Sequence, residues 1–162
     1  MAESISEKVR RLLQPTHDLE RWYAEVEALD VEEAVSVLIG ILKDEAEPMQ
    51  TRSEAATLLG TLHDPRANDA LLEALRAPDG LLRARSALAL GQIGKQGDRE
   101  VQSLIQGLSD EDYFVREACA KALQLMKRLE ALPALERMST TDSVSTNREV
   151  ALKAIEAIRG TT

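Results

Sequence analysis

The sequence predicts an all-α protein, a right-handed α-α solenoid of about four short helical hairpins with a divergent helical cap at the N-terminus. Three observations predict it. Apolar residues recur with helical spacing, no segment shows the period of two that half-buried strands require, and one pattern returns about every 32 residues. A helix pair of this size cannot bury its apolar face alone, so successive pairs must stack around one continuous core.

The repeat becomes visible when four segments are aligned on an arginine. They read TRSEAATLLGTL, LRARSALALGQI, VREACAKALQLM and NREVALKAIEAI. Small residues follow each arginine, and large apolar residues stand seven and ten positions after it. A second apolar group precedes the arginine by eight to ten residues, as in Leu42, Leu75, Leu108 and Met138. Each unit therefore holds two antiparallel helices, A then B, with the arginine near the start of helix B.

The repeat frame also predicts the domain organisation. The array of repeat units spans residues 31–162 as one structural domain, and residues 1–30 do not fit its frame. Those first residues still contain two amphipathic stretches and both Trp22 and Tyr23, which predicts the divergent cap, because terminal repeats are usually atypical. The expected unit boundaries are about 31–66, 67–97, 98–130 and 131–160.

Capping signals indicate where helices begin and end. Two pairs, Asp30 with Glu33 and Thr146 with Glu149, have the spacing of a capping box. The segment GKQG from Gly94 predicts a helix end followed by a loop. Further helix starts are marked by Asp64-Pro65, Pro48, Pro78, Asp98 and Pro133.

The composition excludes several classes of partner. There are 28 acidic and 20 basic residues, a net charge of −8, and residues 1–66 alone carry a net −7. We expect no nucleic-acid partner, because such binding draws its affinity from basic surface. No apolar run reaches the roughly 18 residues that span a bilayer, so we expect a cytoplasmic protein without membrane contact. A single cysteine, Cys119, excludes an intrachain disulfide.

Short motifs recur in the predicted B helices: Val115-Arg116, Ala55-Ala56 with Leu59-Gly60, and Ala89-Leu90-Gly91 with Ile93-Gly94. In their four-unit frame over about residues 31–159, these motifs resemble HEAT repeats, specifically the short HEAT-like type of phycobilin lyase subunits and many small prokaryotic proteins. Gln124 and Glu156 stand where the first two repeats have Gly60 and Gly91. Because larger side chains replace glycine there, it is open whether the helices of the later repeats pack as tightly.

The resemblance implies a ladder in which B-helix arginines bind turn aspartates of neighbouring units. Its arginines would be Arg52, Arg83, Arg116 and Arg148. Its acidic partners would come from Asp44, Asp79, Asp110, Asp112 and Asp142. A row of arginines could instead bind carboxylate or phosphate ligands, because guanidinium forks suit both. The acidic turns beside every arginine favour the structural ladder.

The sequence offers little for catalysis. The only histidines are His17 and His63, and neither is followed by the glutamate of the His-Glu pairs with which HEAT-like deoxyhypusine hydroxylases hold two irons. We expect His63 to act as a cation near a helix C-terminus, with Asp64 capping the next helix. Cys119 is expected to be a buried, inert thiol. We therefore predict no catalytic residue, no metal site and no cofactor.

What remains is surface. If the B helices line the concave side, as the resemblance implies, their variable positions form its face. Leu88 and Leu125 are apolar where their counterparts are Thr, Lys or Ala, so they either anchor a partner or pack under a neighbouring helix. The predicted partner-binding residues are Arg85, Leu88, Gln92, Glu117, Lys121 and Leu125.

These observations lead to a functional prediction with one alternative. The main prediction is a non-enzymatic interaction module or scaffold, not an enzyme, that binds another protein on its concave surface. The alternative, suggested by the resemblance, is a bilin lyase-like subunit or a chromophore-handling accessory protein. A homodimer is a further expectation, because the final helix carries Val150, Ile155 and Ile158 with few residues beyond to cover them.

Overall fold

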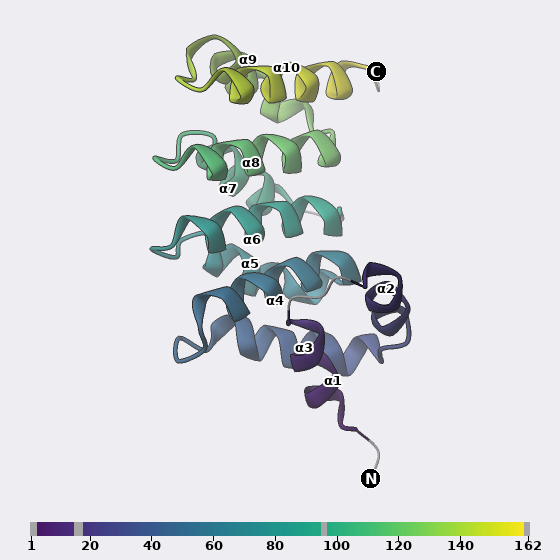
Figure 1. The fold of residues 1–162 in the computed structure, drawn as a ribbon. Coiled ribbons are helices and arrows are strands. Elements are labelled where there is room, and N and C mark those ends of the chain that lie inside the picture. The colour runs from purple at the N-terminus through teal and green to yellow at the C-terminus, as the bar shows by residue number, and fades with distance from the viewer. Residues whose placement is uncertain (1–2, 15–17, 95–96, 161–162) are drawn as a thin grey trace.

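The computed structural model describes residues 3–14, 18–94 and 97–160, and all regular structure within these ranges is helical (Figure 1). This confirms the prediction of an all-α protein. Short 3₁₀ turns at Pro65–Ala67 and Leu129–Ala131 precede two of the helices. The α-helices are α1 (Ile5–Leu12), α2 (Leu19–Glu27), α3 (Val31–Lys43), α4 (Met49–Leu62), α5 (Asn68–Ala74), α6 (Gly80–Ile93), α7 (Asp98–Gly107), α8 (Tyr113–Met126), α9 (Leu132–Thr141) and α10 (Ser145–Arg159).

From α3 onward the helices form four antiparallel pairs that stack into a solenoid, as predicted. The B helices α4, α6, α8 and α10 lie side by side in one layer, and the A helices α3, α5, α7 and α9 form the other (Figure 1). Successive B helices contact one another far more extensively than successive A helices do. A layer whose members lie closer together forms the inner side of a curved stack, so the B helices face the concave side.

Glycines at the B-helix crossings explain this close approach. A Cβ atom added to Gly60 would lie 2.8 Å from the Cα of Ala89, and one added to Gly91 would lie 2.5 Å from the Cα of Ala122. Neither position has room for a larger side chain unless the backbones move apart. The equivalent position in α8 is Gln124, and α8 contacts α10 less extensively than it contacts α6. The missing glycine therefore coincides with looser packing.

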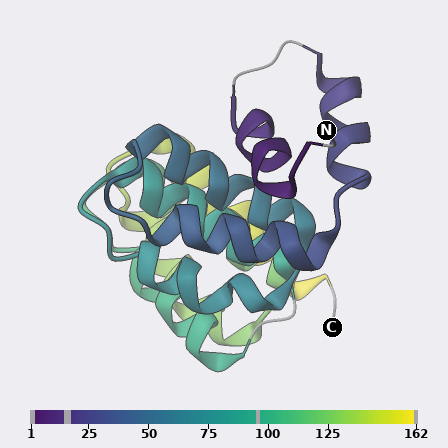
Figure 2. The same cartoon turned by 90° about the horizontal axis from the view of Figure 1, so that it is seen from below.

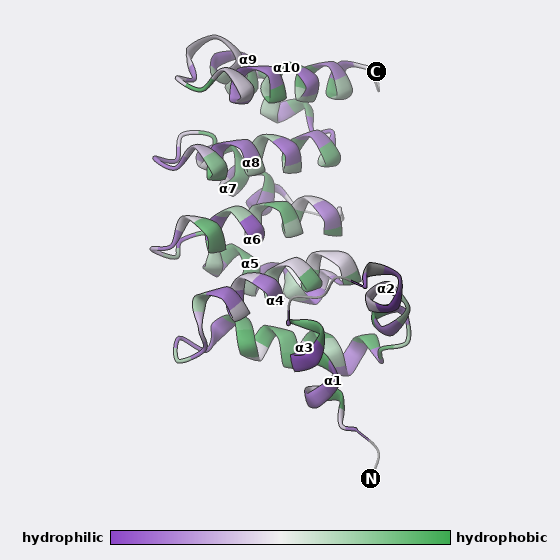
Figure 3. Cartoon of the chain, in the orientation of Figure 1, coloured by the Kyte–Doolittle hydropathy of each residue, from purple (hydrophilic) through white to green (hydrophobic). Residues whose placement is uncertain are grey.

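The core is aliphatic and continuous along the stack. Its fully buried side chains include Leu38, Leu59, Leu71, Leu90, Leu104, Leu123 and Leu135. Ile155 and Ile158 are buried too, so the predicted apolar end built from them is wrong: both point into the core, and Leu152 is the half-exposed apolar residue of α10. Figure 3 shows that α3 is mostly hydrophobic and α2 mostly hydrophilic.

The two N-terminal helices lie to one side of the stack (Figure 2). Helix α1 packs on α3 and buries Val9 completely. Helix α2 is tied to α1 by Trp22, whose Nε1 donates to the carbonyl of Leu12 at 3.0 Å, and the Trp22 ring meets Tyr23 edge to face. The assignment of residues 1–30 as a cap, and the unit boundaries within 31–162, stay predictions.

The caps agree with the sequence at one end of the array and differ at the other. The carboxylate of Asp30 accepts the N–H of Glu33 at 3.1 Å, which is one half of the predicted capping box; the described residues show no return hydrogen bond from the N–H of Asp30 to the Glu33 side chain. Thr146 does not cap α10, whose N-cap residue is Val144. The reason is the preceding turn, in which Asp142 accepts the N–H of Val144 at 2.9 Å and so starts the helix earlier.

Two predictions fall on residues outside the described ranges, namely His17 and the centre of the GKQG loop at 95–96. In the described part of that loop, Gly94 ends α6 with a φ of 72°, a left-handed conformation that glycine adopts without strain. No helix among the described residues combines the length and the apolar character that crossing a membrane requires.

Candidate functional site

A hollow of about 520 Å³ opens between α6 and α8 on the B-helix face. Its volume falls within the range of small-molecule sites in proteins, roughly 300–1,000 Å³. We refer to it as the α6–α8 groove. It is lined by Leu81, Ala84, Arg85, Leu88, Asp112, Phe114, Glu117, Ala118 and Lys121.

The groove has small residues where it is deepest and large apolar residues at its edge. Ala84 and Ala118 are buried, and their methyl groups leave the hollow open. Leu81 and Phe114 remain 45% and 56% exposed, so the rest of the chain leaves much of their apolar surface uncovered. The ring of Phe114 lies against that of Tyr113 with centroids 4.0 Å apart. Such an exposed apolar cluster beside a hollow is typical of a binding site.

Sequence reasoning missed Leu81 and Phe114, although a signal was present. Both stand two residues before the repeat arginine, where the first and last repeats have Gln50 and Thr146. Only the two central repeats are apolar at this position. The repeat pattern is defined by the positions after the arginine, so it does not include the first turn of each B helix.

Charges of both signs line the groove. Glu117 and Lys121, one turn apart on α8, form an ion pair of 2.5 Å. The guanidinium of Arg85 makes no hydrogen bond or ion pair with another described residue. Asp112 caps α8 by accepting the N–H of Phe114 at 2.9 Å. The groove therefore offers an unpaired guanidinium beside apolar walls.

The structure brings four of the six predicted partner-binding residues together in this groove: Arg85, Leu88, Glu117 and Lys121. Gln92 and Leu125 do not line it. Leu88 is partly buried and packs against the core, whereas Leu125 is 57% exposed. The sequence left open whether these leucines anchor a partner or pack under a neighbouring helix. Leu88 packs against the core, whereas Leu125 is exposed and accessible to a partner.

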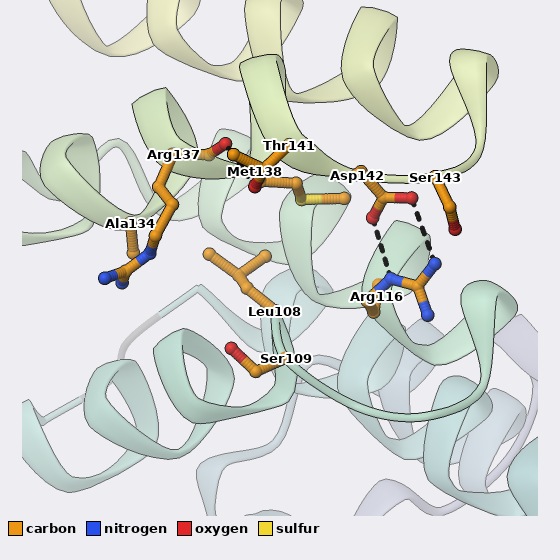
Figure 4. Close-up of a pocket in the computed structure, with 9 residues that line it drawn as sticks. All are labelled: Leu108, Ser109, Arg116, Ala134, Arg137, Met138, Thr141, Asp142 and Ser143. Carbon is orange, nitrogen blue, oxygen red and sulfur yellow. Dashed lines mark hydrogen bonds and ion pairs between the residues drawn. The ribbon is translucent and has the colours of Figure 1, made fainter.

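Two of the repeat arginines bind an aspartate of the following repeat through two hydrogen bonds. Arg83 donates from Nε and Nη2 to Asp110 at 3.0 and 2.8 Å. Arg116 donates in the same way to Asp142 at 2.7 and 3.0 Å (Figure 4). Bidentate pairs of this kind combine strength with fixed geometry, so they set the spacing of the central repeats.

The predicted ladder of four arginines is wrong at both ends. Among the described residues, neither Arg52 nor Arg148 has a carboxylate partner, and Arg148 donates to the backbone carbonyl of Asp142 at 2.6 Å. For Arg52 the reason is a substitution in the pattern, because Ala77 stands where the later repeats have Asp110 and Asp142.

The other candidate aspartates serve their own turns. Asp44, Asp79 and Asp112 accept backbone N–H groups within two or three residues, which fixes the local turn and the helix start. Proximity in sequence to an arginine was therefore not enough to identify a ladder residue.

The two ion pairs change the acidity of their carboxyl groups. The hydrogen bonds from Arg116 lower the pKa of Asp142 to about 2, although burial acts in the opposite direction. Burial raises the pKa of Asp110, but the hydrogen bonds from Arg83 and from the N–H of Asp112 outweigh it, and the pKa lies below its usual value. Both carboxylates are charged at neutral pH.

The polar groups that could support chemistry have structural explanations. Cys119 is fully buried against Gly107, and burial raises the pKa of its thiol to about 12. His63 ends α4, and its Nδ1 donates to the carbonyl of Gln92 at 2.7 Å, which ties α4 to α6. Within residues 3–14, 18–94 and 97–160, no three His, Cys, Asp or Glu side chains gather where they could hold a metal ion.

Comparison with known proteins identifies related sequences. The family model for HEAT repeats matches residues 35–106 and 68–156. The phycocyanobilin lyase subunit alpha of Picosynechococcus sp. is 37% identical over 121 residues, which is 69% of this chain and 42% of that protein. The phycocyanobilin lyase subunit alpha of Synechococcus elongatus is 38% identical over 96 residues, 54% of this chain and 34% of that protein. The chain thus spans less than half the length of these relatives.

Solved structures share the fold. The complex of CpcE and CpcF of phycocyanin lyase from Nostoc contains a chain that superimposes with a TM-score of 0.71 at 22% identity, covering 99% of this chain and 66% of that one. Human deoxyhypusine hydroxylase gives a TM-score of 0.66 at 29% identity, over 78% of this chain and 43% of that one. A designed armadillo repeat protein gives 0.63 at 17% identity, over 95% and 81%.

These relatives contradict two predictions from the sequence, that the protein is a non-enzymatic interaction module and that it has no part in an enzyme. Both curated relatives are lyase subunits by name. The predictions were wrong because the lack of a catalytic constellation was taken to exclude an enzyme subunit, whereas a subunit can contribute by binding alone. Since the HEAT-repeat model matches residues 35 to 156 without a break, the chain belongs to the HEAT-repeat family, and its repeats are of the short type found in phycobilin lyase subunits.

Proposed function

We propose that the chain is a bilin lyase-like subunit that binds and orients a linear tetrapyrrole. The observation that carries the proposal is its 37% identity to a phycocyanobilin lyase subunit alpha over 121 residues. Because the match covers 42% of that relative, the proposal is limited to handling of the chromophore.

The α6–α8 groove supplies the contacts that such a chromophore needs. A linear tetrapyrrole is a conjugated chain of flat rings that carries two propionate groups. The exposed faces of Leu81 and Phe114 suit the rings, because aromatic and aliphatic side chains stack well on flat apolar surfaces. The unpaired guanidinium of Arg85 suits one propionate. The ammonium of Lys121 suits the other only if it exchanges its ion pair with Glu117 for the ligand.

The chain's own thiol supports a binding role without covalent attachment. Cys119 is the single cysteine of the sequence, and it is fully buried with its pKa raised to about 12. It is therefore neither accessible nor ionised, and a thiolate is the form that reacts. The chromophore would be held in the groove by contacts alone and passed to another protein.

A second protein is part of the proposal. The relative of known structure, CpcE, is in complex with CpcF. We propose that a partner subunit covers the B-helix face, where Gln92 and Leu125 extend the surface beyond the groove. Self-association stays a prediction that now depends on Leu152, and a cytoplasmic location stays a prediction from the sequence.

Titration with phycocyanobilin tests the groove. We expect a shift in visible absorbance and induced circular dichroism on binding. The double variant Leu81→Ser with Phe114→Ser should weaken binding about tenfold or more, because each removes apolar area that the ligand covers. Leu125→Ser is the matched control, since Leu125 is equally exposed but lies outside the groove. An equal loss in the control, or no spectral change in the unmodified chain, would contradict the proposal.

Leu125 tests the partner surface. The chain is mixed with CpcF, and the mass of the complex is measured by light scattering. We expect a one-to-one complex that Leu125→Glu weakens, with helicity unchanged because the side chain is exposed. Leu88 is unsuitable for this test because it packs partly on the core. A stable dimer of the chain alone would support self-association instead.

A further inference from the structure

The structure contains a repeat arginine that faces alanine where its counterparts bind aspartate. Arg83, Arg116 and Arg148 each donate from Nη1 to the carbonyl six residues earlier, which belongs to Ala77, Asp110 and Asp142. Because each carbonyl accepts from the same arginine nitrogen, Ala77, Asp110 and Asp142 occupy equivalent positions in successive turns. At two of them, the side-chain carboxylate binds the arginine of the preceding repeat. At the third, the side chain is the methyl group of Ala77.

Because Ala77 has no carboxylate, the arginine of the preceding repeat, Arg52, lacks the partner that Arg83 and Arg116 have. Its side chain is partly buried, and Nε donates to the carbonyl of Leu42 at 2.9 Å. Its Nη1 and Nη2 make no hydrogen bond or ion pair with a described residue. A guanidinium has five N–H donors, so four of them, a bidentate pair included, remain available.

Arg52 lines a hollow of about 480 Å³ between the turns that precede α4 and α6. The equivalent hollow at Arg116 measures about 330 Å³ and holds the carboxylate of Asp142 (Figure 4). Both hollows are built from the same positions of neighbouring repeats. The one at Arg52 has a methyl group where the other has an aspartate side chain.

The charge and the lining of this hollow indicate its ligand. Lys43 is paired with Glu73 at 3.0 Å, and Glu45 is the other acidic residue in the lining. The guanidinium of Arg76 makes no hydrogen bond or ion pair with a described residue. Two guanidinium groups without an ion pair to a described residue therefore line one hollow, and Glu45 offsets only one of these two positive charges. Ala70, Ala74 and Pro78 supply apolar surface beside them.

We infer that this hollow binds the carboxylate of a small organic acid with an apolar body. The carboxylate lies where the side chains of Asp110 and Asp142 lie in the later repeats. It accepts from Nη1 and Nη2 of Arg52, because Nε already donates to the carbonyl of Leu42. The apolar body lies on Ala70, Ala74 and Pro78. The hollow is far larger than one aspartate side chain, which favours a free acid over an acidic residue of a partner. The inference is independent of the α6–α8 groove.

Calorimetric titration with phenylbutyrate tests the inference, and phenylbutyramide serves as its uncharged counterpart. We expect the acid to bind at least about tenfold more tightly than the amide, because only the acid forms charge-assisted hydrogen bonds. Arg52→Gln should abolish the preference for the acid. Arg137→Gln is the matched control: Arg137 is the exposed arginine that lines the hollow at Arg116 and makes no side-chain hydrogen bond with a described residue (Figure 4).

A second variant places the missing carboxylate inside the chain. Ala77→Asp should accept hydrogen bonds from Nη1 and Nη2 of Arg52, raise the melting temperature by roughly 2–4 °C and remove binding of the acid. Ala77→Asn, which is isosteric with the aspartate variant but uncharged, should raise the melting temperature less and should weaken binding of the acid less. Equal binding of acid and amide, an effect of Arg137→Gln, or undiminished binding by Ala77→Asp would overturn the inference. So would binding of a capped acidic peptide when the free acid does not bind. Binding of phenylbutyrate does not depend on whether the groove takes a tetrapyrrole, so the two proposals fail separately.

Discussion

The residue on which the central repeats depend most is Asp142. Its side chain is only 2% exposed, and it accepts hydrogen bonds from Arg116, from the N–H of Val144 and from Asn147. A carboxylate that is buried with all these donors is stable only while it is charged. Removing it would leave the buried guanidinium of Arg116 with backbone carbonyls but without a neutralising carboxylate, which is the costly way to break such a pair.

This makes a prediction about pH. The pKa of Asp142 is about 2 in the folded chain and about 3.9 in an unfolded one. Because folding lowers the pKa, the stabilisation, about 2 kcal/mol, is fully present above pH ~4 and is lost as the pH falls toward ~2. Asp142→Asn should lower the free energy of unfolding by about 3 kcal/mol at neutral pH. In urea titrations the gap to the unmodified chain should narrow below pH ~4, and a gap independent of pH would contradict this.

Cys119 gives a second prediction at this scale. The thiol is fully buried and its pKa is about 12, so hardly any reactive thiolate is present in the folded chain. An aromatic disulfide reagent should leave the native protein unmodified at mildly alkaline pH and should label it fully in concentrated urea. Fast labelling of the native protein would show that α7 and α8 separate readily, contrary to the packing of Cys119 against Gly107.

At the scale of helices, the glycines of the B layer decide how closely the repeats approach. Gly60 and Gly91 lie against the neighbouring B helix, whereas Gly40, in the middle of α3, has no atom within 4 Å of an added Cβ. The same residue type therefore has opposite roles in these two B helices and in α3. In the B layer glycine permits contact, and in α3 it only weakens the helix.

Paired alanine substitutions test this difference. Gly91→Ala should lower the free energy of unfolding by about 1–3 kcal/mol, because the new methyl group would overlap Ala122 and push α6 and α8 apart. Gly40→Ala should raise it by about 0.5–1 kcal/mol, because alanine is the better helix former and its methyl group meets nothing. Chemical denaturation measures both, and a stabilising Gly91→Ala would refute the packing argument.

At the scale of the whole molecule, each repeat contacts mainly its neighbours, as in other solenoids. Helices α6 and α8 each pack between two B helices, whereas α2 has only limited contact with α1. Local stability should therefore decrease from the centre of the stack toward the N-terminal helices.

Hydrogen exchange measured by mass spectrometry tests this gradient. Amides of α6 and α8 should exchange slowest, and those of α2 should exchange faster by orders of magnitude, because opening α2 exposes little apolar surface. The half-buried Trp22 offers an independent probe, since its fluorescence should respond at lower denaturant concentration than the helical circular dichroism does. Coincident transitions would show that the N-terminal helices unfold together with the array.

The sequence by itself determined the helical class, the four-fold repeat and the residues that fill its core. Apolar spacing reports directly which face of a helix must be buried, and the aligned positions of Leu59, Leu90 and Leu123 are buried without exception. The arginine frame likewise included the two arginines that join the repeats, Arg83 and Arg116, although Arg52 and Arg148 form no such link. It also located the B-helix surface on which four of the six predicted site residues come together.

Only the tertiary structure decided which groups meet. The α6–α8 groove needs Leu81 and Phe114 from adjacent B helices, and the spacing between repeats that places them together comes from the close contact at Gly91. The partner of each arginine lies in the next repeat, so the difference between Arg116, which has Asp142, and Arg52, which faces Ala77, depends on how the turns stack. Periodicity describes one helix at a time, whereas a site is formed by atoms from two, and their relative position is set by packing.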